Sequence, residues 1–192
     1  IPREQFGFRK GRSVESNLLA CLNDWSLAAY NLKSIDVIYL DFAKAFDKVP
    51  LNLLMLKLKA YGVSGLLLAW IQSFLTNRKF CVRVSKQLSD IYNVISGVPQ
   101  GSVLGPKLFL VYVADIPNDM VSSCAMYADD IKLYNDVANS HNLQNDLNKI
   151  FNWSENWGVP LNTKKCVVLH IGKNNPEKNY VLNGVSLFKV LE

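Results

Sequence analysis

Two apolar segments that end in aspartate limit what this chain can fold into more than any other feature. Ile35 to Phe42 is rich in β-branched and aromatic residues, which is typical of a buried strand, and Asp41 lies at its end. Cys124 to Ala128 predicts a second strand, Asp129-Asp130 a two-residue turn, and Ile131 to Tyr134 the return strand. The fold must therefore accommodate the strand at 35–42 together with a hairpin at 124–134, far along the chain.

The order of the remaining elements narrows the choice to an α+β fold. The chain gives strand, helices, strand-turn-strand, helix and strand, which is the split β-α-β arrangement of ferredoxin-like sheets. In that topology the first strand lies beside the central hairpin, so Asp41 is expected next to the Asp129-Asp130 turn. The predicted helices cover 14–29, 51–61, 64–76, about 101–119 and 140–157, and the other predicted strands cover 80–84, 91–95, 166–171 and a weak hairpin near 179–190.

The first helix has a start signal and an apolar stripe. Ser13 is a good N-cap. At helical spacing, the apolar stripe of this helix consists of Val14, Leu18, Leu22, Trp25 and Ala29.

Composition excludes several classes of protein. With 192 residues and 49% hydrophobic against 19% charged residues, the chain suits one globular domain, with room for part of a second lobe. Disordered, collagen-like and coiled-coil chains are excluded. No apolar run approaches the roughly 18 residues that a membrane span needs, so we expect no membrane association. The start lacks both a signal peptide and a methionine, which predicts an intracellular segment of a longer protein.

Cysteine and histidine spacing argues against a zinc site. The cysteines form no CxxC pair, and His141 and His170 are isolated in the sequence. We interpret the cysteines as reduced core residues of an intracellular protein; free thiols in a secreted fold are the alternative. They are Cys21, Cys81, Cys124 and Cys166.

The three aspartates at the strand ends are the strongest chemical signal. Carboxylates at such positions can simply be turn formers. Adjacent strand ends, however, would gather Asp41, Asp129 and Asp130 in a small volume, and like charges there require a cation. Oxygen-only ligands suit Mg²⁺ or Mn²⁺. Two such ions about 4 Å apart form the clamp used for in-line phosphoryl transfer.

Five ordered blocks resemble the reverse transcriptases of LINE-type (non-LTR) retrotransposons, and they cover almost the whole chain. Tyr-Ala-Asp-Asp alone would be a weak signal, but five blocks in order are specific. Asp41–Asp47 resembles motif A, Ser96–Pro106 motif B, Tyr127–Asp130 motif C, Leu161–Lys165 motif D, and Gln5–Ser13 the segment that precedes motif A.

The resemblance implies a fold and a domain plan. It implies a right-hand polymerase palm, a ferredoxin-like sheet with helices on one face, plus a partial fingers region. Residues 1–34 would be a fingers segment, and residues 35–192 the palm. The palm would include a fingers-proximal insert near 64–98 and be truncated before the primer grip and thumb.

The resemblance also implies an activity and its partners. The activity is RNA-directed DNA synthesis serving retrotransposition, by a two-metal mechanism with Mg²⁺ or, alternatively, Mn²⁺. The partners are an RNA template, a DNA primer, deoxynucleoside triphosphates and the rest of a larger polyprotein. The location implied is the nucleus.

Roles follow for the acidic residues and one lysine. Asp41, Asp129 and Asp130 would be catalytic and hold the ions, together with the backbone carbonyl of Phe42. Lys165 would protonate the leaving pyrophosphate, although a solvated lysine is the plainer interpretation and Lys164 is a competing candidate.

Three further residues are implied to face the nucleotide. Phe46 would close the sugar pocket and exclude a 2′-hydroxyl, although residue type alone favours a core aromatic. Gln100 and Gly101 would lie against the incoming nucleotide and template, although Gly-Val-Pro-Gln-Gly can be merely a structural turn.

The basic residues near the start have two interpretations. A charge run is usually a solvated face. In the context of the resemblance, Arg9, Lys10 and Arg12 would contact template or primer phosphates.

Other functions remain open at this point. One is a catalytically incompetent remnant or scaffold that keeps the polymerase fold and binds RNA or DNA; intact Asp41, Asp129 and Asp130 argue against it. Another is an RNA-directed RNA polymerase, against which Ala128 and Phe46 argue. Lys107 stands where relatives are usually apolar, which suits ordinary drift or a decaying copy.

Overall fold

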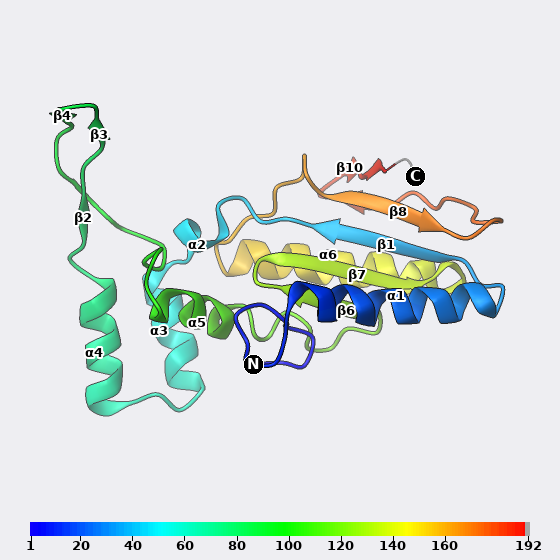
Figure 1. Cartoon of the computed structure of the whole chain (residues 1–192), viewed down its shortest axis with the longest axis horizontal. Coiled ribbons are helices and arrows are strands. Elements are labelled where there is room, and N and C mark those ends of the chain that lie inside the picture. The colour runs from blue at the N-terminus through cyan, green and yellow to red at the C-terminus, as the bar shows by residue number, and fades with distance from the viewer. Residues whose placement is uncertain (191–192) are drawn as a thin grey trace.

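A five-stranded sheet forms the centre of the computed structural model, which describes residues 1–190 (Figure 1). The strand order is β11-β8-β1-β7-β6. β1 is antiparallel to both of its neighbours, and β6 and β7 form the predicted hairpin. This order and these directions confirm the ferredoxin-like arrangement with the first strand beside the hairpin. The strands are β1 (Ile35–Leu40), β6 (Ser123–Tyr127), β7 (Asp130–Asp136), β8 (Val167–Ile171) and β11 (Phe188–Lys189).

The main core lies between one face of the sheet and three helices. Alternate residues of β1 and β7, such as Ile38 and Leu133, point into this core and are fully buried. The predicted helix at 140–157 forms and buries Leu143, Leu147 and Ile150 against them. The helices are α3 (Leu51–Ala60), α5 (Leu104–Tyr112) and α6 (Ser140–Asn156).

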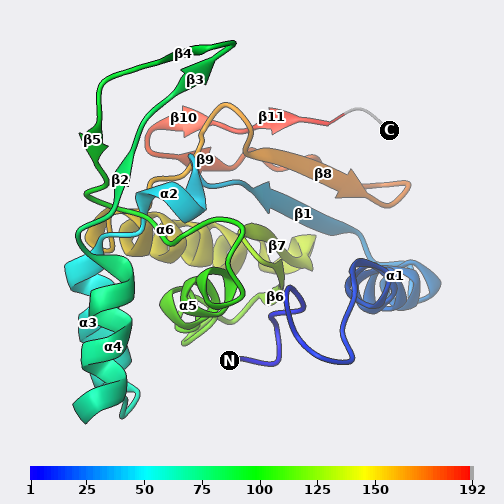
Figure 2. The same ribbon diagram turned by 60° about the vertical axis from the view of Figure 1, so that its left-hand side comes forward.

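The prediction of helices on one face only is wrong. Helix α1 (Val14–Tyr30) packs on the opposite face of the sheet, where Cys21 joins Val37 and Ala125 in a second, smaller core (Figure 2). Successive side chains of a strand point to opposite faces, so apolar residues at Val37 and Ile38 require cover on both sides.

Helix α1 does not bury most of its apolar stripe. Ser13 caps it as predicted, in a reciprocal capping box with Ser16. Its buried residues, however, are Asn17 and Cys21, whereas Leu18 and Leu22 are exposed. Asn17 accepts a 2.7 Å hydrogen bond from Lys132 Nζ on β7, so a polar contact fixes the rotation of the helix.

The segment between α3 and α5 extends away from the sheet (Figures 1 and 2). The predicted helix and hairpin both form, as helix α4 (Gly65–Leu75) and a ribbon of very short strands. Helix α5 ends at Tyr112, earlier than the expected end near 119. The ribbon strands are β2 (Lys79–Phe80), β3 (Arg83–Val84), β4 (Gln87–Leu88) and β5 (Tyr92–Asn93).

The C-terminal part of the described chain forms the predicted hairpin and adds one strand. β9 (Val181–Leu182) pairs with β10 (Val185–Ser186), and β11 then runs parallel to β8 at the sheet edge. Two short helices, α2 (Ala45–Lys48) and the 3₁₀ helix η1 (Val137–Asn139), follow β1 and β7.

The cysteines are all free thiols, as predicted, but they are not all core residues. Cys21 and Cys166 are buried, Cys124 is partly buried, and Cys81 is exposed on the ribbon. Across residues 1–190, none of the helices has the length and apolar character required to span a bilayer.

Candidate active site

The structure places Asp41 and Asp130 at the ends of neighbouring strands. Leu40 of β1 lies opposite Ile131 of β7, so Asp41 and Asp130 are the next residues outward on the two strands. Both line a cavity of about 410 Å³. The other residues around this cavity are Tyr39, Leu40, Ile131, Lys132 and Lys165. The structure therefore brings Asp41 and Asp130 together at one edge of the sheet.

The hairpin turn is shifted by one residue from the predicted position. Tyr127 pairs with Asp130, so the two turn residues are Ala128 and Asp129, and Asp130 begins β7. Ala128 has a φ of +56°, in the left-handed region. Asp129 thus lies at the tip of the turn, whereas Asp130 shares the sheet face of Asp41.

The carboxylates influence one another electrostatically. Desolvation raises the pKa of Asp129, and the negative charges of Asp130 and Asp41 raise it further. The pKa of Asp130 is raised by desolvation first and by Asp41 second, while Lys132 and Lys165 oppose the shift. Apposed carboxylates of this kind favour a proton or a cation between them.

Asp41 has an oxygen that the protein leaves without a hydrogen bond. Its Oδ2 is buried and accepts none, although Lys165 Nζ lies 3.1 Å away as an ion pair. A buried carboxylate oxygen of this kind suits a cation, and carboxylate oxygens are ligands that Mg²⁺ prefers. Within residues 1–190, however, no three acidic, histidine or cysteine side chains are arranged as a ready metal cluster.

The segment after α6 brings Lys165 to Asp41. Asn162 N donates to Asp41 O at 2.8 Å, and Ala43 N donates to Pro160 O at 2.8 Å, so this segment pairs with the chain just beyond β1. Phe42 is buried there and bridges to Leu161. Lys165, rather than Lys164, has its ammonium at Asp41.

Phe46 lies on α2 and is partly buried. Its ring stacks on Phe109 of α5 with centroids 4.3 Å apart, and the edge of Phe8 approaches it at 6.2 Å. The structure thus gives Phe46 a packed position that also retains an accessible surface.

The loop before α5 is joined to the turn that carries Phe46. Gln100 Nε2 donates to Asp47 Oδ1 at 2.8 Å, and Val98 N donates to Phe46 O at 2.9 Å. Gly101 has a φ of +75° and open space where a side chain would be. Gln100 and Gly101 are exposed, so both are accessible to a ligand.

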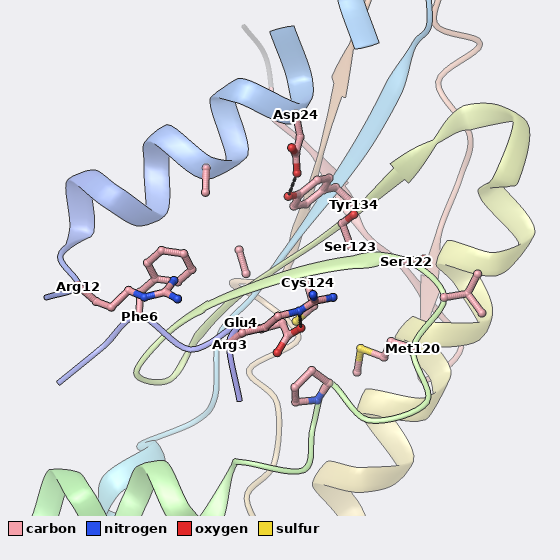
Figure 3. Close-up of a pocket in the computed structure, with 14 residues that line it drawn as sticks. Arg3, Glu4, Phe6, Arg12, Asp24, Met120, Ser122, Ser123, Cys124 and Tyr134 are labelled. Atoms are coloured by element: carbon pink, nitrogen blue, oxygen red, sulfur yellow. Dashed lines mark hydrogen bonds and ion pairs between the residues drawn. The ribbon is translucent and has the colours of Figure 1, made fainter. Parts of the chain in front are cut away.

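The basic residues near the start do not form one patch at the carboxylates. Arg9 donates to the carbonyls of Pro2 and Gln5 at 2.6 and 3.0 Å, whereas Lys10 is exposed. The guanidinium of Arg12 lies over the Phe6 ring at 4.3 Å (Figure 3). Arg12 lines a different cavity, of about 430 Å³, between α1 and the β6 edge.

Sequence reasoning missed one residue of the cavity and one residue that contacts the hairpin turn. Lys132 lines the carboxylate cavity, and it could have been found because it lies two residues after Asp130 on the same face of a strand. Gln5 is buried against the hairpin turn that carries Asp129, and it bonds to Ala128. Nothing in a single sequence indicates a contact between residues 123 positions apart.

Proteins of known type match this chain over most of its length. It is 36% identical over 179 residues to the RNA-directed DNA polymerase from mobile element jockey of Drosophila melanogaster, covering 86% of the chain and 19% of that protein. It is 31% identical over 194 residues to the probable RNA-directed DNA polymerase from transposon X-element of the same species, covering 94% of the chain and 21% of that protein. The chain spans about a fifth of the length of these relatives.

Solved structures share the fold at low sequence identity. The telomerase from Candida albicans, in complex with a fragment of telomeric RNA, superposes with a TM-score of 0.66 at 15% identity, covering 96% of this chain and 34% of that one. The apo telomerase from Candida tropicalis gives a TM-score of 0.64 at 13% identity, covering 96% of this chain and 36% of that one. These likenesses support a polymerase palm-type fold.

A family model described as reverse transcriptase (RNA-dependent DNA polymerase) matches residues 1–187. That match includes every block of the sequence resemblance and both strands that carry the carboxylates. The chain therefore belongs to the reverse transcriptase (RNA-dependent DNA polymerase) family, and its relatives are polymerases of non-LTR retrotransposons.

Proposed function

We propose that this chain is the palm, with part of the fingers, of an RNA-directed DNA polymerase that serves retrotransposition. The observation that carries the proposal is the placement of Asp41 and Asp130 at neighbouring strand ends, in one cavity with Lys165. In a member of the reverse transcriptase family, this is where nucleotidyl transfer would occur.

The residues that would hold metal are Asp41, Asp129, Asp130 and the carbonyl of Phe42, with Mg²⁺ as the ion and Mn²⁺ as an alternative. When bound, two such ions activate the primer 3′-hydroxyl and neutralise charge on the triphosphate and its leaving group. The buried Oδ2 of Asp41 and the raised pKa values of Asp129 and Asp130 support this assignment.

Other residues would bind, orient and protonate. Lys165 would donate a proton to the departing pyrophosphate, and its 3.1 Å ion pair with Asp41 supports that role. Phe46 would exclude a 2′-hydroxyl from the sugar pocket. Gln100 and Gly101 would contact the nucleotide and template from their exposed loop.

The wider assignments belong to the same proposal. Residues 1–34 would be part of the fingers and residues 35–192 the palm with its insert near 64–98. The partners would be an RNA template, a DNA primer, deoxynucleoside triphosphates and the remainder of a larger polyprotein, and the location would be nuclear. Lys10 would contact phosphate directly, whereas Arg9 and Arg12 would first have to leave the contacts that they make within the chain.

Primer extension tests the proposal. The chain with its natural flanking sequence is supplied with primed RNA, deoxynucleotides and Mg²⁺, and product length is followed on a denaturing gel. We expect extension by the parent, none by Asp129→Asn, and parental extension by Asp90→Asn, which changes an exposed carboxylate in the ribbon. Nucleic-acid binding without extension, unchanged by Asp129→Asn, would instead favour a scaffold.

A further inference from the structure

The residue before Asp129 has a backbone conformation that side chains disfavour. Ala128 has a φ of +56°, where a Cβ crowds the neighbouring carbonyl. It is also buried, with 6% of its surface exposed. A conformation of this kind persists only where the surroundings hold it in place.

The side chain of Gln5 bonds to both polar backbone groups of this residue. Ala128 N donates to Gln5 Oε1 at 2.8 Å, and Gln5 Nε2 donates to Ala128 O at 3.0 Å. Gly7 N also donates to Gln5 Oε1, at 2.8 Å. Since two N–H groups face the oxygen and one carbonyl faces the nitrogen, only one orientation of the amide satisfies all three.

The backbone around Gln5 is fixed to the same strand. Met126 N donates to Glu4 O, and Phe6 N donates to Met126 O, both at 2.8 Å, so the segment adds a short parallel bridge to the edge of β6. Figure 3 shows Glu4 and Phe6 lying along this edge, below α1.

Glycine at position 7 allows the close approach. A Cβ built at Gly7 would lie 2.4 Å from Ala128 N, which no real side chain tolerates. Gln5 itself is only 1% exposed. The buried amide therefore cannot exchange its bonds to Ala128 for bonds to water without moving the segment.

We propose that Gln5 is a positioning residue, whose amide holds the Ala128 peptide groups in place and so sets where the carboxylate of Asp129 lies. The inference rests on the proposed polymerase function and assigns a role to a residue outside the carboxylate site. The side chain of Gln5 bonds to the residue that precedes Asp129, so it acts through Asp129.

Removing the side-chain amide of Gln5 tests whether this residue positions the turn or only stabilises the fold. For Gln5→Ala we expect the maximal rate of primer extension to fall at least about tenfold, because small displacements of catalytic groups are costly. The KM for deoxynucleotide should change little. The matched control is Gln144→Ala, since Gln144 makes the same pair of bonds to Val181 N and O, at 2.9 and 2.8 Å, far from the site.

Gln5→Glu supplies a readout that a purely structural role would not move. An ionised Glu can accept from both N–H groups but cannot donate to Ala128 O, whereas a protonated Glu can. Burial raises the pKa of such a carboxyl, so the ratio of variant to parent rate should rise as the pH is lowered from about 8.5 to about 6.5. This variant also serves if Gln5→Ala does not fold.

Hydrogen exchange tests the contact without any activity. The Ala128 amide should exchange faster in Gln5→Ala, and amides of β8 should not change. Parental rates and parental exchange in both Gln5 variants would overturn the proposal, as would faster exchange with an unchanged extension rate. A parent that fails to extend primers would instead contradict the proposed polymerase function, and the exchange result would still stand.

Discussion

At the scale of single residues, the site places three negatively charged carboxylates close together beside one lysine. Asp129 and Asp130 have raised pKa values, and Asp41 and Lys165 form an ion pair beside them. Functional sites often keep such unfavourable arrangements because the ligand relieves them. Three predictions belong to this scale.

Phe46→Val should relax sugar selection. A smaller side chain at this position opens the space that a 2′-hydroxyl would need, so we expect ribonucleotide incorporation to rise at least about tenfold relative to deoxynucleotide incorporation. Single-nucleotide incorporation kinetics measure the ratio. Because Phe46 stacks on Phe109, the Tm is recorded in parallel, and an unchanged ratio in a folded variant would contradict the role.

Lys165→Leu should slow chemistry more than it weakens nucleotide binding. Loss of a general acid typically costs about 10²–10⁴-fold in rate. Single-turnover incorporation at increasing nucleotide concentration separates the two effects. Lys164→Leu is the control, since its neighbour Lys165 is the lysine at Asp41, and equal effects of the two substitutions would refute the assignment.

Asp129→Asn should stabilise the metal-free fold while abolishing extension. The folded-state pKa of Asp129 is raised, so the native chain binds more protons than the unfolded chain and loses stability as the pH rises above about 4. We expect a Tm gain of about 1–3 °C at neutral pH, absent near pH 4, by differential scanning fluorimetry. Added Mg²⁺ should reduce the gain, and a Tm loss at neutral pH would contradict the argument.

At the scale of elements, short hydrogen-bonded segments connect the parts of the site. The loop before α5 bonds to the chain around α2, and the segment after α6 bonds to the chain just beyond β1. Gly97 lies where the loop before α5 meets the chain that follows α2, and its N–H donates to Val49 O at 2.8 Å. Because the contact is backbone to backbone, the chain has little room to adjust.

Gly97→Ala should therefore destabilise the fold by about 3 kcal/mol, more than positive φ alone explains. Gly97 has a φ of +82°, and a Cβ there would lie 2.7 Å from Asp47 Cα and O. Gly184→Ala is the matched control, with a φ of +76° and open space around the Cβ, and should cost about 1 kcal/mol. Urea unfolding measures both, and equal losses would show that the close approach does not matter.

At the scale of the whole molecule, one buried lysine connects three helices. Lys57 of α3 is 4% exposed, and its Nζ donates to Tyr112 O and Asp115 Oδ1, both at 2.5 Å. The ammonium also lies 3.8 Å from the centroid of the Trp157 ring, which follows α6. Burial lowers the pKa of Lys57, and Asp115 opposes that shift.

Lys57→Ala should cost about 3–5 kcal/mol, because it leaves polar partners and a cavity behind. Lys59→Ala, on the exposed side of the same helix, should change stability by less than about 0.5 kcal/mol. Chemical denaturation of both variants measures the difference. Similar losses for the two lysines would mean that the buried contacts contribute nothing beyond helix propensity.

Most helices and strands, and the family, could be predicted from the amino-acid sequence alone. The strand before Asp41, the hairpin around Asp129 and the ferredoxin-like order follow from local periodicity and turn chemistry, which depend on near neighbours in the chain. The motifs could likewise be recognised from short stretches of the sequence. The predicted position of the hairpin turn was wrong by one residue, because alanine at position 128 gives no sequence signal for the left-handed conformation that it adopts.

Which faces of the helices and the sheet pack together depends on long-range contacts and could not be predicted from the sequence. Helix α1 lies on the second face of the sheet. It buries Asn17 and Cys21 there and leaves Leu18 exposed. The tertiary structure also brings Gln5 to Ala128 across 123 positions. These outcomes depend on long-range contacts such as that of Lys132 with Asn17, and no local sequence pattern encodes the energies of such contacts. The contacts that support the turn before Asp129 are therefore apparent only in the three-dimensional structure.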